Sequence, residues 1–119
     1  GASYMLRGSQ APGPMLWDAG CTVAITTDCN PGTSFFESMA PIVSLAVVQT
    51  GLTVEQAIWA ATRGGALALE LPDRGLVTEG GVGDLVVLDA PDPAHIPYRP
   101  ATDLTWRVIR SGSVVDGES

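Results

Sequence analysis

Residues 26–34 read Thr26-Thr27-Asp28-Cys29-Asn30-Pro31-Gly32-Thr33-Ser34, and they decide the predicted fold. The mostly apolar run before them, from Cys21 to Thr27, predicts a short strand buried on both faces, as in a parallel sheet covered by helices. A Pro-Gly turn follows, and Ser34-x-x-Glu37 predicts a capping box that opens a helix. This order of strand, turn and helix predicts that the Asp28 carboxylate lies at the end of the strand. Backbone N–H groups of a helix start would lie beside it, where an anionic ligand group can bind.

Three helices are predicted after this stretch. Apolar residues at three- and four-residue spacing predict a helix from Phe35 that ends at Thr50-Gly51. A second capping box at Thr53-x-x-Gln56 predicts another helix, which should stop at Gly64-Gly65. A third, short helix is expected from Ala66 to Leu71, because Pro72 follows it.

Near Pro72 the pattern of the sequence changes, and glycine-rich segments that predict turns alternate with short apolar runs. The alternation predicts a strand at Asp84 to Asp89 and a closing hairpin around Ser111-Gly112. We therefore expect two regions, 1–72 with a strand and helices and 73–119 with β-strands. The predicted fold class is α/β.

The composition excludes several classes of function. The 119 residues allow one domain of ordinary size, and a formal charge of −7 with six arginines and no lysine argues against nucleic acid or an anionic membrane as a partner. The longest apolar stretch, Ala40 to Val48, is far shorter than the roughly 20 residues of a membrane span. Cys21 and Cys29 would lie about 26 Å apart on an extended chain, so we expect free thiols in a reducing cytoplasm.

The stretch TTDCNPGTS closely resembles the T-D-x-N-P-G-T signature of the imidazolonepropionase family, a branch of the amidohydrolase superfamily. The resemblance extends to the blocks LTVEQAIWAATRGGALAL, GGVGDLVVLDAPD and LTWRVIRSGSVV, which are similar, in the same order, to the C-terminal third of that family. It therefore covers essentially all 119 residues. Gly83 and Tyr98-Arg99 depart from the family pattern, which favours a small residue such as alanine and a Tyr-His pair there.

The resemblance implies a metal-dependent (β/α)8 barrel joined to a small β-sandwich. Residues 1–72 would supply the last barrel strand and the C-terminal helices, and residues 73–119 would supply strands of the sandwich. The implied activity is a step of histidine degradation. It is the hydrolysis of the ring C–N bond of 4-imidazolone-5-propanoate, which gives N-formimino-L-glutamate.

The same resemblance assigns roles to four residues. Asp28 matches the aspartate of the metal site and the carboxylate that moves a proton, and Asn30, Gly32 and Thr33 match residues that contact the substrate or product. The implied cofactor is a divalent metal, zinc or iron, and such a site needs several histidines. The one histidine, His95, lies in a proline-rich loop where the family has no ligands. We therefore expect this chain alone to be inactive, with the rest of the barrel supplied by a longer chain.

Two alternatives remain open at this stage. The chain could be a non-catalytic fragment or module that covers its apolar faces and strand edges by forming a homo-oligomer. It could also belong to another deaminase or cyclic amidase of the superfamily, although Asn30-Pro31-Gly32-Thr33 argues against that.

Overall fold

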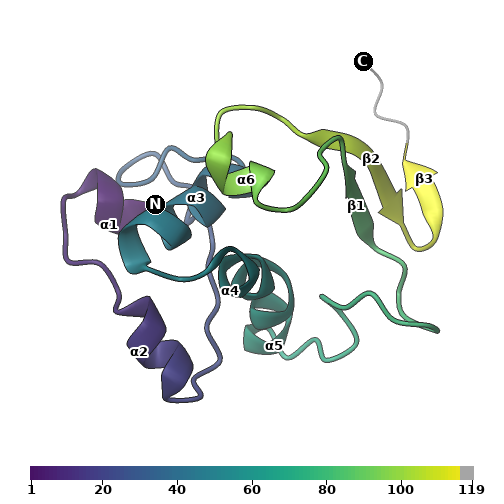
Figure 1. Ribbon diagram of the computed structural model, residues 1–119, viewed down its shortest axis with the longest axis horizontal. Coiled ribbons are helices and arrows are strands. Elements are labelled where there is room, and N and C mark those ends of the chain that lie inside the picture. The colour runs from purple at the N-terminus through teal and green to yellow at the C-terminus, as the bar shows by residue number, and fades with distance from the viewer. Residues whose placement is uncertain (116–119) are drawn as a thin grey trace.

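The computed structural model describes residues 1–115, with the helices on one side and a small antiparallel sheet on the other (Figure 1). The α/β class is therefore confirmed. The elements are α1 (Ala2–Met5), α2 (Gly13–Asp18), α3 (Met39–Thr50), α4 (Val54–Trp59), the π-helical turn η1 (Ala60–Gly64), α5 (Gly65–Ala68), β1 (Leu85–Leu88), α6 (His95–Tyr98), β2 (Thr105–Arg110) and β3 (Ser113–Val115).

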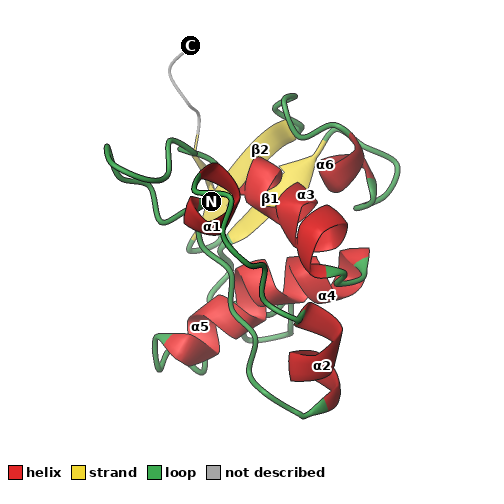
Figure 2. Cartoon of the chain, turned by 90° about the vertical axis from the view of Figure 1, so that its left-hand side faces the viewer, coloured by secondary structure: helices red, strands yellow, loops and turns green. Residues whose placement is uncertain are grey.

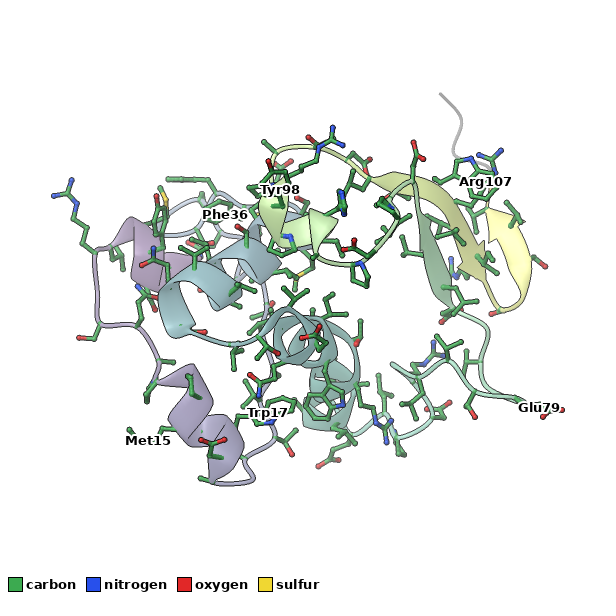
Figure 3. The ribbon with its side chains drawn as sticks, in the orientation of Figure 1. Met15, Trp17, Phe36, Glu79, Tyr98 and Arg107 are labelled. Atoms are coloured by element: carbon green, nitrogen blue, oxygen red, sulfur yellow. The ribbon has the colours of Figure 1, made fainter. Side chains whose placement is uncertain are left out.

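The core forms around α3, which packs against α2, α4 and α6. Its central buried residues are Val43, Ala46, Leu52 and Ala57. Trp17 points from α2 toward α4 (Figure 3), where its ring meets that of Trp59 edge-on, with centroids 5.3 Å apart. The predicted apolar stripe of the long helix is thus the face that builds the core.

The long helix α3 begins later than expected. The predicted capping box at Ser34 and Glu37 is wrong, because the helix starts at Met39 with Ser38 at its N-cap. Pro41 gives the physical reason. It has no N–H, so it is tolerated in the first turn, whereas a helix from Phe35 would place it in the interior. The predicted end is confirmed, since Gly51 adopts the left-handed conformation with φ 77°.

The second predicted capping box is confirmed. Thr53 accepts a hydrogen bond from the N–H of Gln56, and the side chain of Gln56 accepts one from the N–H of Thr53. The predicted stop at Gly64-Gly65 is wrong, because α4, η1 and α5 run on as one rod (Figure 2). Both glycines keep right-handed helical angles, so they do not end the helix.

The strand expected at Cys21 to Thr27 is not a strand in the described part of the chain. The segment is extended, and its backbone bonds to neighbouring helices: Cys21 N–H donates to the carbonyl of Leu16 in α2 at 3.1 Å, and Ile25 N–H donates to the carbonyl of Ala60 in η1 at 3.2 Å. A parallel strand needs a partner strand for its backbone groups. The three strands of residues 1–115 pair only with one another, so this segment has no such partner.

The sheet has the order β1-β2-β3 and is antiparallel throughout. The predicted hairpin is confirmed, with Ser111 and Gly112 both at positive φ in its turn. A row of valines, Val86, Val108 and Val115, crosses the three strands on one face, and all three side chains are exposed. No described element covers this apolar face.

Candidate functional site

Residues 26–34 form a compact loop between the extended segment and α3, and Asn30 is its internal brace. The Oδ1 atom of Asn30 accepts hydrogen bonds from the N–H groups of Gly32 (2.9 Å) and Thr33 (2.8 Å) and from the Thr33 hydroxyl (3.2 Å). Its Nδ2 donates to the carbonyl of Asp28 at 2.6 Å. An asparagine suits this position because its side chain both accepts and donates.

Ser34 closes the loop from the other end. Its Oγ donates to the carbonyl of Thr27 at 2.6 Å, and its own carbonyl accepts the N–H of Asn30 at 2.8 Å. Sequence reasoning missed this role by assigning Ser34 to a helix cap. Pro41 was the signal that could have corrected the assignment, because it moves the helix start to Met39 and leaves the Ser34 hydroxyl without a helix to cap.

Asp28 projects from the loop with a backbone φ of 48°, in the left-handed region that aspartate adopts more readily than most residues. Its side chain is exposed. Within residues 1–115 its carboxylate makes no hydrogen bond or ion pair, so neither oxygen is engaged by another described residue. Such a carboxylate suits one position in a metal site or a proton-transfer role, but does not define either by itself.

The backbone N–H groups that were expected to face an anionic ligand point elsewhere. Those of Gly32 and Thr33 are directed at Asn30 Oδ1, inside the loop. The N-terminus of α3 begins only at Met39, so it does not follow directly on the turn. In this structure the loop therefore offers the Asp28 carboxylate rather than a ring of free N–H donors.

The described residues hold no cluster of three or more histidine, cysteine or acidic side chains that could bind a metal. Both cysteines are free, as expected, and both are exposed. His95 lies at the start of α6, and its Nδ1 is 3.4 Å from Asp92 Oδ1 without making a hydrogen bond. Asp28 can thus supply one ligand, and the remaining ligands of the implied metal site are not found in residues 1–115.

The extended segment that leads into the loop rests on the π-helical turn. Gly64 lies so close to it that a Cβ atom there would come within 2.0 Å of the Val23 carbonyl oxygen. The structure thus explains a glycine that the sequence pattern had assigned to a helix stop. The exposed Asp28 loop therefore extends from a segment that is closely packed against the π-helical turn.

Comparison with known protein families shows which family the chain belongs to. A model described as "Amidohydrolase family" matches residues 5–116, nearly the whole sequence. The chain belongs to the amidohydrolase family. No helix of residues 1–115 has the length and apolar character needed to cross a bilayer.

Its similar relatives are more specific. The chain is 48% identical to an imidazolonepropionase of Streptomyces griseus over 115 residues, which is 97% of this chain and 30% of that protein. It is 45% identical to the imidazolonepropionase of Nocardia farcinica, over 96% of this chain and 29% of that protein. With the imidazolonepropionase of Cutibacterium acnes the identity is 50%, over 82% of this chain and 24% of that protein. The chain thus spans less than a third of the length of these curated relatives.

Proposed function

We propose that this chain is part of a metal-dependent cyclic amidohydrolase that hydrolyses the ring C–N bond of 4-imidazolone-5-propanoate in histidine degradation. The observation that carries the proposal is the similarity to imidazolonepropionases at 48% identity over 97% of the chain. The exposed Asp28 in a braced loop supports it, because the signature of that family centres on this aspartate.

Asp28 would act in two ways. Its carboxylate would be one ligand of a divalent metal, zinc or iron, which when bound supplies an acidified water and polarises the ring carbonyl. The same carboxylate would accept a proton from the water and pass it to the leaving ring nitrogen. Its exposure and its lack of a hydrogen-bond partner within residues 1–115 leave both oxygens available for these tasks.

Asn30, Gly32 and Thr33 would contact the substrate or product. The side chain of Asn30 already serves as the brace of the loop, so substrate contact would use its remaining Nδ2 hydrogen. Gly32 is exposed, and the absence of a side chain lets a ligand approach its backbone. Thr33 would contribute its hydroxyl, which now donates to Asn30 Oδ1 over 3.2 Å.

We also propose the division into a barrel part, 1–72, and a β-sandwich part, 73–119, whose last four residues lie outside the described range. The uncovered valine face of the sheet favours packing against further strands. These could come from a longer chain or from a second copy in a homo-oligomer. Light scattering with size-exclusion chromatography tests self-association, and a monomeric 119-residue chain would exclude the homo-oligomer.

A chimera tests the proposed activity. The 119 residues would replace the matching segment of the S. griseus imidazolonepropionase, which supplies the rest of the enzyme. We expect the metal-loaded chimera to consume 4-imidazolone-5-propanoate, and Asp28→Asn to lower kcat by at least about 100-fold. Asp18→Asn is the matched control, because Asp18 is another exposed aspartate, at the end of α2.

The outcomes separate the possibilities. An inactive but folded chimera would refute the proposed function. Turnover that is unchanged by Asp28→Asn would refute the role of Asp28. A chimera that instead deaminates or opens a related ring would favour another member of the superfamily.

A further inference from the structure

We propose that Ser34 is a positioning residue that fixes the backbone conformation of Asp28, and with it the position from which the Asp28 side chain projects. The inference deepens the proposed function and rests on it for its catalytic meaning. Ser34 is the one polar side chain that is fully buried within the described residues, with 0% of its surface exposed. A hydroxyl is costly to bury unless it makes a hydrogen bond, and this one donates to the Thr27 carbonyl at 2.6 Å.

The acceptor of that bond explains its consequence. The Thr27 carbonyl belongs to the peptide plane that joins Thr27 to Asp28. Because the peptide is planar, holding its oxygen restricts the rotation that sets φ of Asp28. That angle is 48°, in the left-handed region, which is uncommon for non-glycine residues although aspartate adopts it more readily than most.

Ser34 holds the loop at two points. Its hydroxyl binds the residue before Asp28, and its carbonyl accepts the N–H of Asn30 after it. Asn30 in turn bonds to the Asp28 carbonyl and to the N–H groups of Gly32 and Thr33. The conformation of Asp28 is thus held from both sides, and the buried hydroxyl closes the loop by joining Ser34 to Thr27.

The chain offers a matched control in Ser44. Its hydroxyl also donates to a backbone carbonyl, that of Pro97 at 3.0 Å, but this bond joins α3 to α6, outside residues 26–34. Ser34→Ala and Ser44→Ala therefore delete the same group and the same type of hydrogen bond. A general loss of stability would follow from either, whereas a change at Asp28 should follow only from the first.

The first test uses the 119-residue chain and NMR spectroscopy. The coupling between the amide and α protons of Asp28 reports its φ, and amide exchange of Asn30 reports the opening of the loop. We expect Ser34→Ala to change the Asp28 coupling and to accelerate Asn30 exchange by about tenfold. Ser44→Ala should change neither. Unchanged values in Ser34→Ala, or equal changes in Ser44→Ala, would overturn the proposal.

A second variant covers the case in which Ser34→Ala does not fold. Ser34→Cys keeps a weak donor, so exchange of Asn30 should lie between that of the parent and that of an open loop. If Ser34→Cys matches the parent in both exchange and coupling, the hydroxyl does not hold Asp28 and the proposal is wrong.

The chimera supplies the catalytic readout. There Ser34→Ala should lower kcat by about tenfold or more, with KM within about twofold, because a displaced carboxylate affects the chemical step. A fall no larger than that of Ser44→Ala would overturn the positioning role. If the parent chimera is inactive, the proposed function fails, while the NMR measurements still decide whether Ser34 holds the loop.

Discussion

Gly64→Ala provides a sharp test of the packing beneath the candidate site. Gly64 and Gly65 are adjacent in the same helical rod and have nearly identical backbone angles, φ −59° and ψ −45° against φ −60° and ψ −44°. Helix propensity alone predicts that alanine stabilises either position by about 1 kcal/mol. Their surroundings differ, since an added Cβ lies 2.0 Å from the Val23 oxygen at Gly64, whereas the nearest atom at Gly65 is 3.8 Å away.

The magnitude follows from what must move. Relief of the contact at Gly64 requires the extended segment to shift by about 1 Å, which breaks the 3.2 Å bond between Ile25 N–H and the Ala60 carbonyl. Overpacking of this kind costs about 1–3 kcal/mol, and an orphaned N–H adds about 1–3 kcal/mol. After the propensity gain, we expect Gly64→Ala to lower the free energy of unfolding by about 3 kcal/mol.

Urea denaturation followed by tryptophan fluorescence and circular dichroism measures both variants. Trp17 and Trp59 report on this region through their edge-to-face contact. Gly65→Ala should be about 1 kcal/mol more stable than the parent, opposite in sign to Gly64→Ala. If Gly64→Ala is as stable as Gly65→Ala, the extended segment does not rest on the π-helical turn as described.

Two further predictions concern local hydrogen bonds. Thr53→Ala should lower the free energy of unfolding by about 1 kcal/mol, because it removes the hydroxyl acceptor of the capping box, and Thr53→Ser should restore most of it in the same urea assay. The pKa of Asp103 is lowered, first by the backbone N–H of Thr105 and then by its hydroxyl. A depressed carboxyl pKa contributes stability that is present above the unfolded pKa, near pH 4, and is lost as the pH falls through the folded pKa. An NMR titration should therefore give a higher Asp103 pKa in Thr105→Val than in the parent, and an equal pKa would contradict the assignment.

The sequence by itself determined the features that depend on neighbouring residues. The capping box at Thr53 and Gln56, the end of α3 at Gly51 and the hairpin turn at Ser111-Gly112 each rest on contacts a few positions apart, so their residue types suffice. The motif around Asp28 likewise identified the candidate site and its family through residues in a row. The roles of Asp28, Asn30, Gly32 and Thr33 in substrate and metal binding stay predictions.

Only the tertiary structure decided what the isolated polar and glycine residues do. Ser34 fits a helix cap by its local pattern, yet its hydroxyl is buried on the Thr27 carbonyl. Gly64 fits a helix stop, yet it allows the Val23 backbone to approach the rod. The run Cys21 to Thr27 has the composition of a strand but lacks a strand partner within residues 1–115. In each case the deciding partner is remote in sequence or outside the described residues, and local preference yields to packing and hydrogen bonding between distant segments.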